Sequence, residues 1–363
     1  MTGMMRRGVT LALVSAAALF AGPITYTATS LGTLGGNYTA AAGINSAGQV
    51  TGNSEITGNG AFHAYLYGGG NMTDLGTVGG TSSYGLAINN AGQIAGSSQF
   101  TGSTYQHAFL YSGGVMTDLG TLGGIYSYGN AINASGEVAG YSKTTGGADH
   151  AFLYSGGVMH DLGTLGGTNS YATGINAAGQ MVGWANTAGG AQHAFLYTGG
   201  VMTDLGTLGG ATSDGRAINA LGQVTGESTT SGGANDGFLY SGGVMTDLGT
   251  LGGTDTRGIA LNDEAEVTGY SELGNGNYDA FLYSGGTIYD LNSLVVSGLG
   301  TGVSLEEGDG INDSGLIIAE GTDGRAYLLT PVPEPRALVL FALLIGVVVR
   351  VVARYARRSR RLG

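Results

Sequence analysis

An internal repeat dominates this chain of 363 residues and limits the folds that it can adopt. An Ile-Asn or Leu-Asn pair recurs every 43 or 44 residues, with one longer interval before the last copy. Between the pairs, the string HAFLYSGGVMTDLGTLGG, at 107–124, returns almost unchanged. A period of this length indicates a chain built from stacked copies of one supersecondary unit. The pairs begin at Ile44, Ile88, Ile132, Ile175, Ile218, Leu261 and Ile311.

One uninterrupted copy, residues 125–167, shows how the unit is organised. Two turns stand out within it: Asn-Ala-Ser-Gly at 133–136, with the residues that a type I turn prefers, and the pair Gly156-Gly157, which supplies the positive φ of a tight hairpin. We expect two hairpins joined by glycine-rich connections. The four expected strands are 128–133, 137–142, 150–154 and 158–162, and the expected connections are 143–149 and 163–169.

Composition supports an all-β fold. No helical apolar period persists in the repeats, and 73 glycines oppose helix formation. Four short strands in about 43 residues are typical of a β-propeller blade. The first copy starts late, at 24–31, and the last ends early, at 325–329, so each supplies the strand that the other lacks. We therefore predict a seven-bladed propeller of four-stranded antiparallel blades, over 23–331, closed by the N-terminal strand; a β-solenoid is the alternative.

Both ends of the chain carry export features. Arg6 and Arg7 precede an apolar stretch at 9–20 and a small-residue site at 21–22, which predicts a secretory signal over 1–22. The other end, 332–363, holds Val332, Pro333, Glu334 and Pro335, then an apolar run and an arginine-rich tail.

This C-terminal segment resembles the PEP-CTERM sorting signals of Gram-negative bacteria. The resemblance implies that an exosortase-type membrane enzyme reads residues 332–335 while the apolar run is transiently inserted in the membrane. It also implies export to the cell surface or extracellular matrix. A plain C-terminal membrane anchor is the alternative interpretation.

The charge between the two ends is strongly negative. Nine of the 13 basic residues lie in the ends, whereas 24 of the 25 acidic residues lie between them, which leaves a net charge near −20. Nucleic acid is an improbable partner for such a surface. Extracellular polysaccharide or a matrix protein stays open as a partner.

The repeat itself resembles the HAF-type extracellular repeat proteins, named for the triplet that begins at His107, His150 and His193. The likeness covers nearly the whole chain between the two ends. It implies an extracellular location, and it brings no established activity, cofactor or catalytic residue.

Two repeat positions carry histidine and aspartate. We expect each His to form a hydrogen bond within its own unit, and each Asp to bind a turn amide or that His, or to deter pairing of edge strands. We expect no metal site, because the His side chains lie in different units and the Asp lacks neighbouring oxygen ligands. The His position holds His63, His107, His150, His193, Asp236, Asp279 and Arg325; the Asp position holds Asp74, Asp118, Asp161, Asp204, Asp247 and Asp290.

Departures from the repeat are the candidate binding segments. The interval between Asp290 and Asn312 is longer than elsewhere and contains Glu306, Glu307 and Asp309. It either binds a ligand or adjusts the closure of the ring. A second segment replaces the usual Thr-Gly-Gly-Ala loop with polar residues that suit a binding rim: Glu272, Asn275, Asn277 and Tyr278.

The sequence lacks the known catalytic motifs: it has no Cys, no Gly-x-Ser-x-Gly and no His-Glu-x-x-His. We therefore expect an exported, non-enzymatic binding or structural module of the cell surface or matrix, without a cofactor. The alternative is a polysaccharide hydrolase or lyase that uses Glu306, Glu307 and Asp309. We expect a ligand on the face with the longer loops, and we expect repeat tyrosines such as Tyr111 and Tyr154 to belong to the core.

Overall fold

Turn chemistry sets the path of the chain in each repeat of the computed structural model, which describes residues 24–58 and 60–332. In the turn that begins at Asn133, the Gly136 amide donates a hydrogen bond to the Asn133 carbonyl at 3.0 Å. In the second hairpin, Gly156 and Gly157 have φ angles of +62° and +85°. Both predicted hairpins are confirmed.

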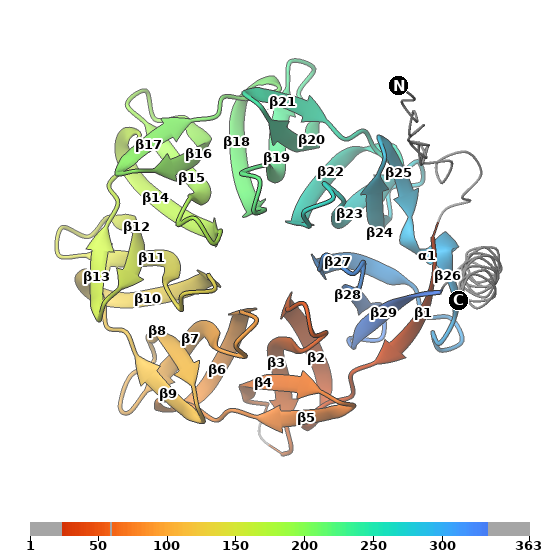
Figure 1. Cartoon of the computed structure of the whole chain (residues 1–363), viewed down its shortest axis with the longest axis horizontal. Helices are drawn as coiled ribbons and strands as arrows, with labels where there is room; N and C mark the ends of the chain where they lie inside the picture. The colour runs from red at the N-terminus through yellow and green to blue at the C-terminus, as the bar shows by residue number, and fades with distance from the viewer. Residues whose placement is uncertain (1–23, 59, 333–363) are drawn as a thin grey trace, which may run out of the picture. The chain divides into compact units, whose positions relative to one another are not determined.

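Six repeats each form four antiparallel strands, which follow one another from the centre of the ring outward (Figure 1). The innermost strands are β2 (Gly35–Ile44), β6 (Gly79–Ile88), β10 (Gly123–Ile132), β14 (Gly166–Ile175), β18 (Gly209–Ile218) and β22 (Gly252–Leu261). The second strands are β3 (Val50–Ile56), β7 (Ile94–Phe100), β11 (Val138–Thr144), β15 (Met181–Thr187), β19 (Val224–Thr230) and β23 (Val267–Leu273). The third are β4 (Phe62–Gly68), β8 (Gln106–Ser112), β12 (Asp149–Ser155), β16 (Gln192–Thr198), β20 (Asn235–Ser241) and β24 (Tyr278–Ser284). The outermost are β5 (Asn71–Asp74), β9 (Val115–Asp118), β13 (Val158–Asp161), β17 (Val201–Asp204), β21 (Val244–Asp247) and β25 (Thr287–Asp290).

The all-β prediction is confirmed, but the predicted bounds of the inner strand and of its connection were wrong. The inner strand is ten residues long, and β14 begins at Gly166 within the stretch expected to be a loop. Gly166 pairs with Thr187, and a register shift separates this pair from Ser170 and its partner. Glycine at positive φ lets the chain enter the sheet early, which a pattern of side-chain hydrophobicity does not reveal.

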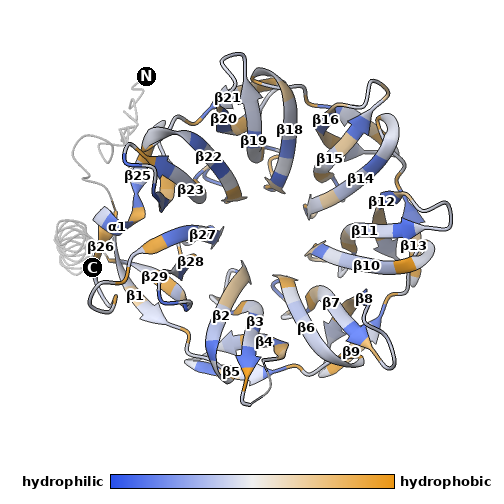
Figure 2. Cartoon of the chain, turned by 180° about the vertical axis from the view of Figure 1, so that it is seen from behind, coloured by the Kyte–Doolittle hydropathy of each residue, from blue (hydrophilic) through white to orange (hydrophobic). Residues whose placement is uncertain are grey.

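The hydrophobic core lies between consecutive repeats. One cluster joins Ala108 and Leu119 of one repeat to Val138 and Phe152 of the next. Tyr111 and Tyr154 pack against these clusters, as predicted. Glycine is needed where strands approach closely: a Cβ on Gly140 would overlap the Tyr128 carbonyl oxygen. Figure 2 shows hydrophilic and hydrophobic residues interspersed along the strands of the sheets.

The remaining strands form one sheet from both ends of the described chain. Its order is β26 (Val295–Ser297), β1 (Thr25–Ser30), β29 (Ala326–Val332), β28 (Ile317–Gly321) and β27 (Leu305–Ile311). The long interval supplies the helix α1 (Leu291–Leu294) and the strand β26, which pairs in parallel with β1. The interval thus provides the outermost strand of this sheet, which has five strands, one of them paired in parallel, rather than the predicted four antiparallel strands.

Two predicted segments lie outside the described residues: the secretory signal over 1–22 and the sorting motif from Pro333 onward. Val332 is the last residue of β29. In the described part of the chain, no helix is long and apolar enough to cross a membrane.

Candidate functional site: a central cavity

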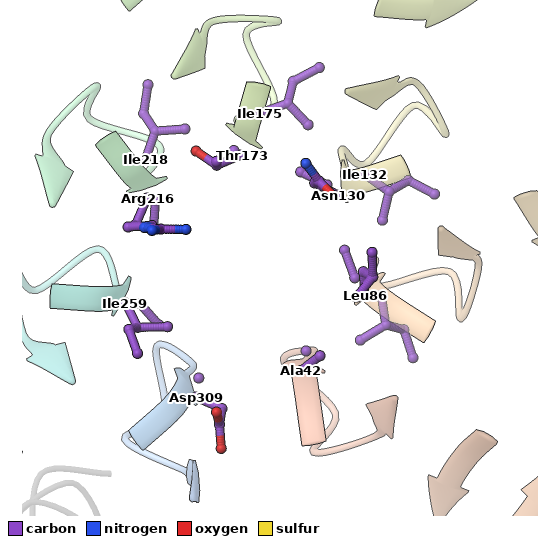
Figure 3. Close-up of a pocket in the computed structure, with 18 of the residues that line it drawn as sticks. Ala42, Leu86, Asn130, Ile132, Thr173, Ile175, Arg216, Ile218, Ile259 and Asp309 are labelled. Atoms are coloured by element: carbon purple, nitrogen blue, oxygen red, sulfur yellow. The ribbon is translucent and has the colours of Figure 1, made fainter. Parts of the chain in front are cut away.

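A cavity of about 660 Å³ lies where the inner strands converge (Figure 3). Each inner strand contributes the residue three positions before its repeat Asn. These lining residues are Ala42, Leu86, Asn130, Thr173, Arg216, Ile259 and Asp309.

A β-bulge directs each of these side chains. In β10, Gly129 pairs with Gly140 and Ala131 with Ala139, so Asn130 is an extra residue without a partner on β11. The same register shift occurs at the corresponding position of every inner strand. A bulge bends its strand and re-aims one side chain, a device often found beside binding sites. The repeat therefore presents one residue per inner strand to the cavity.

Two bulge residues also tie adjacent inner strands together. Asn130 Nδ2 donates a hydrogen bond to the Ala172 carbonyl at 2.8 Å, and Thr173 Oγ1 donates to the Gly215 carbonyl at 2.7 Å. These bonds hold the wall of the cavity in one arrangement, as a preformed site requires.

Aromatic rings form an arc on one side of the cavity. The ring centroids of Tyr128 and Tyr141 are 4.9 Å apart, those of Tyr141 and Tyr171 4.3 Å, and those of Tyr171 and Trp184 4.2 Å. Tyr141, Tyr171 and Trp184 line the cavity. The Tyr171 hydroxyl donates to Asp149 at 2.8 Å, and burial is the first cause that raises its pKa. The arc gives the cavity flat apolar surfaces with polar edges.

An ion-pair network includes Arg216, the one member of the network that lines the cavity. Arg257 pairs with Glu227 through two nitrogens, of which Nε lies 2.6 Å from Oε2. Arg216 Nη2 lies 2.8 Å from Asp214 Oδ2. Burial raises the pKa of Asp214 to about 7, although Arg216 opposes this shift. Burial alone would also raise the pKa of Glu227, but hydrogen bonds from Arg257 and its charge lower it below the ordinary value.

The last inner strand, β27, and its neighbour β28 add carboxyl groups without a basic partner. Among the described residues, Glu307, Asp309 and Glu320 form no ion pair; Glu320 accepts a hydrogen bond from the Tyr38 hydroxyl at 2.7 Å. Burial, followed by repulsion from Glu307 and Glu320, raises the pKa of Asp309 well above its usual range. Burial and Glu320 likewise raise the pKa of Glu307. Asp309 is therefore neutral over a wider pH range than an exposed aspartate.

The predicted acids do not act as one group. Asp309 lines the cavity, and Glu307 contributes to the raised pKa of Asp309, whereas Glu306 is exposed. Glu306 instead contributes to the raised pKa of Asp279, after burial and the neighbouring Asp290. Alternation along β27 separates adjacent side chains, so a trio of acids on one strand is divided between two environments.

The second predicted segment, residues 272–278, lies on the surface and away from the cavity lining. Glu272 accepts hydrogen bonds from the Thr254 amide and hydroxyl, at 2.8 and 2.9 Å, and this contact lowers its pKa. Asn275 accepts from the Asn277 amide at 3.0 Å. The exposed Tyr278 donates to Asp255 at 3.1 Å. None of the four is a lining residue of the central cavity.

The histidine and aspartate positions have the predicted structural role. His150 Nδ1 lies 2.8 Å from Asp161 Oδ2, and Asp161 Oδ1 accepts a hydrogen bond from the Gly163 amide at 2.8 Å. The contacts of His63, His107 and His193 with their Asp partners are equivalent. Within residues 24–58 and 60–332, no group of three or more His, Cys, Asp or Glu side chains is arranged to hold a metal ion.

Local patterns do not predict Arg216, Tyr141, Tyr171 or Trp184 as site residues. Alignment of the repeats with one another does indicate the cavity position. The position three before the repeat Asn differs in every copy, whereas the residues around it largely recur. A position that varies within an otherwise constant repeat is a candidate for a role that differs between the copies.

Comparisons with known proteins agree with a propeller scaffold. No protein-family model and no curated protein sequence matches this chain. Its structure is similar to the β-propeller domain of the Trilobed protease from Pyrococcus furiosus, with a TM-score of 0.51 and 10% identity over 71% of this chain and 82% of that one. It is also similar to a catalytically inactive virginiamycin B lyase from Staphylococcus aureus with quinupristin (TM-score 0.50, 13% identity, 85% of this chain and 100% of that one). For a puromycin-hydrolysing peptidase of Mycobacterium tuberculosis the TM-score is 0.50, the identity 11%, and the coverage 75% of this chain but only 46% of that one. At these identities the likeness concerns the fold, and it establishes an all-β propeller built from repeated antiparallel sheets.

Proposed function

We propose that this chain is an exported, non-enzymatic propeller that binds extracellular polysaccharide or matrix protein through its central cavity. The observation that carries this proposal is the set of bulge residues. A bulge recurs in each inner strand, yet it presents a different residue each time. A purely structural repeat has no need for seven different side chains around one cavity.

A protein and glycan array, probed with the labelled full-length chain at several calcium concentrations, tests this function. Binding to a polysaccharide or matrix component supports it. A chain that binds nothing under any of these conditions contradicts it. Asp313→Asn, a change on an exposed turn, serves as a matched control for handling and folding.

The proposal includes seven blades, with β1 closing the ring. Two observations support closure: β1 lies between β26 and β29, and the Leu31 amide donates a hydrogen bond to the Ala326 carbonyl at 3.0 Å. Deletion of residues 24–31 should leave β29 as an exposed edge and lower stability. A synthetic 24–31 peptide should restore the thermal midpoint; a deletion variant as stable as the full chain would argue against closure by this strand.

Export and processing form the second part of the proposal. The signal over 1–22 would direct secretion, and an exosortase-type enzyme would read Val332, Pro333, Glu334 and Pro335 and place the protein at the cell surface or in the matrix. The intact mass of protein recovered from the medium tests this part. A mass that ends near residues 332–335 supports sorting, whereas a retained arginine tail supports a plain anchor.

A polysaccharide hydrolase or lyase is the second candidate. It is favoured by the raised pKa values of Glu307 and Asp309, since perturbed carboxyl groups beside a cavity are typical of acid–base catalysis. New reducing ends or unsaturated sugar ends should then appear when the protein meets its polymer. Loss of these products in Glu307→Gln and Asp309→Asn, but not in Glu306→Gln, would establish this activity over simple binding.

A further inference from the structure

The cavity wall contains two buried polar atoms of opposite hydrogen-bonding character that have no partner. Arg216 Nε is a donor and Asp309 Oδ2 is an acceptor, and neither forms a hydrogen bond within the described structure. Both belong to bulge residues that line the same cavity, with Ile259 between them along the ring (Figure 3). Buried polar groups in native proteins are almost always paired, so these two atoms indicate a ligand that supplies both an acceptor and a donor.

We infer that the central cavity binds a neutral saccharide, whose hydroxyl groups accept from Arg216 Nε and donate to Asp309 Oδ2. This inference rests on the proposed binding function and names the class of its ligand. A hydroxyl group donates and accepts, and it carries no charge. One polyhydroxylated ligand therefore satisfies both atoms.

Charge makes a simple ion a poorer fit. An ammonium group would bring positive charge towards Arg216, and a carboxylate would approach Asp214, the carboxyl group that already pairs with Arg216. The other polar bulge residues, Asn130 and Thr173, are neutral. The free carboxylates Glu307 and Glu320 are not among the lining residues. Arg216 is already paired with Asp214, and burial favours the neutral form of Asp309, so the lining offers no unpaired charge to an ion and suits a neutral ligand.

The aromatic arc gives an independent reason for a sugar. Tyr141 and Trp184 line the cavity, and neither the Tyr141 hydroxyl nor the Trp184 indole N–H forms a hydrogen bond to the residues that the structure describes. A pyranose ring has an apolar C–H surface bordered by hydroxyl groups, which matches an aromatic surface with polar edges. The volume of about 660 Å³ lies within the range of about 300–1,000 Å³ that is usual for small-molecule sites, so a short oligosaccharide would fit.

Trp184 provides a direct assay, because it is the only tryptophan in the chain and it lies on the cavity wall. The full-length protein is titrated with neutral gluco-, xylo- and N-acetylated chito-oligosaccharides, and in parallel with deacetylated chito-oligosaccharides and oligouronates. At least one neutral series should change the Trp184 fluorescence saturably and give a matching Kd by calorimetry. Saturation by only the cationic or only the anionic series would overturn the inference.

Variants then locate the site. Asp309→Leu and Arg216→Met should each weaken binding by about tenfold or more, because each leaves a ligand hydroxyl unpaired. Asp309→Asn keeps a neutral side chain with an acceptor oxygen and should change Kd by less than about threefold. Arg216→Lys retains the positive charge beside Asp214 and so separates loss of the Nε donor from loss of the ion pair. Circular dichroism and the thermal midpoint, measured for every variant and for the control Asp313→Asn, show whether each variant is folded.

The outcomes separate this inference from the proposed function. Saccharide binding that survives Asp309→Leu and Arg216→Met in folded protein overturns the central site but leaves the binding function intact. Binding of a matrix protein without any saccharide does the same. Failure to bind any array component contradicts both.

Discussion

Asn312 Nδ2 donates a hydrogen bond to the backbone carbonyl of Asn45, which is 2.9 Å away in space and 267 residues earlier in the chain. Most repeat asparagines bond in this way to the next repeat, including Asn45 to Asn89 and Asn89 to Asn133. Each also accepts backbone amides of its own turn, as Asn312 Oδ1 does from Ser314 and Leu316. One side chain thus fixes the turn and links it to its neighbour, and the last copy links to the first.

Asn312→Asp should lower the free energy of unfolding by about 1–3 kcal/mol, because it keeps the turn acceptor but removes the donor to Asn45 and sets a charge beside that buried carbonyl. Urea unfolding of the full chain measures the change. The matched control, Asp313→Asn, keeps an acceptor oxygen for the Asp263 amide and should be nearly neutral. Equal stability of Asn312→Asp and wild type would mean that the link contributes nothing.

Asp236→His should stabilise the protein. Asp236 occupies the histidine position opposite Asp247, its buried Oδ1 has no partner in the described chain, and burial with repulsion from Asp247 and Asp255 raises its pKa. A histidine would restore the contact seen at His150 and Asp161, so we expect a gain of about 1–2 kcal/mol at pH 8. Thermal unfolding checks this. Asp279→His should gain less, because the Asn292 side chain already favours the ionised form of Asp279 by lowering its pKa against the effect of burial. An unchanged or lower midpoint for Asp236→His would refute the explanation.

The stability of the wild type should fall as pH rises from about 4 to about 7, in part through Asp214. Its pKa is 3.8 when unperturbed and about 7 in the folded protein. Between these values the unfolded chain has lost the proton that the folded chain still binds, so deprotonation favours unfolding, with a total effect of about 4 kcal/mol at most. Above about pH 7 both states are ionised and this contribution is constant.

Asp214→Asn removes that titration, so its free energy of unfolding should change less than that of wild type between pH 4.5 and pH 8. Urea unfolding at the two pH values gives the difference. Loss of the contact with Arg216 shifts the stability of the variant at both pH values, and only the slope is diagnostic. If the free energy of unfolding changed equally with pH in Asp214→Asn and in wild type, Asp214 would not be the group responsible for this pH dependence.

Glu227→Gln should cost about 3–5 kcal/mol, because it leaves Arg257 without its buried counter-charge. Glu272→Gln is the control: its amide oxygen still accepts from Thr254, and we expect little change. The double variant Glu227→Gln/Arg257→Gln should lose less than the sum of the two single variants. Additive losses, measured by a double-mutant cycle, would show that the pair is not coupled.

Much of the fold was predictable from the sequence because its causes are local. The Asn-Ala-Ser-Gly turn at 133–136, the Gly156-Gly157 hairpin and the contact of His150 with Asp161 involve residues within about a dozen positions of one another. Their repetition at a fixed period then predicts a propeller. Asp309 and Glu307 were predicted as site residues only because they lie in the interval that breaks the period.

The cavity itself depended on the tertiary structure. Arg216 and Asp309 are 93 positions apart by number, and only the arrangement of inner strands around one axis brings them to the same wall. The bulge that aims each of them is a shift in strand pairing, which leaves no mark in hydrophobic periodicity. The same pairing placed Glu306 apart from Glu307 and Asp309. The sequence by itself determined the repeated unit, through turns and alternation; the tertiary structure decided which position of that unit faces the axis, because that position depends on the register between strands and on how the sheets pack.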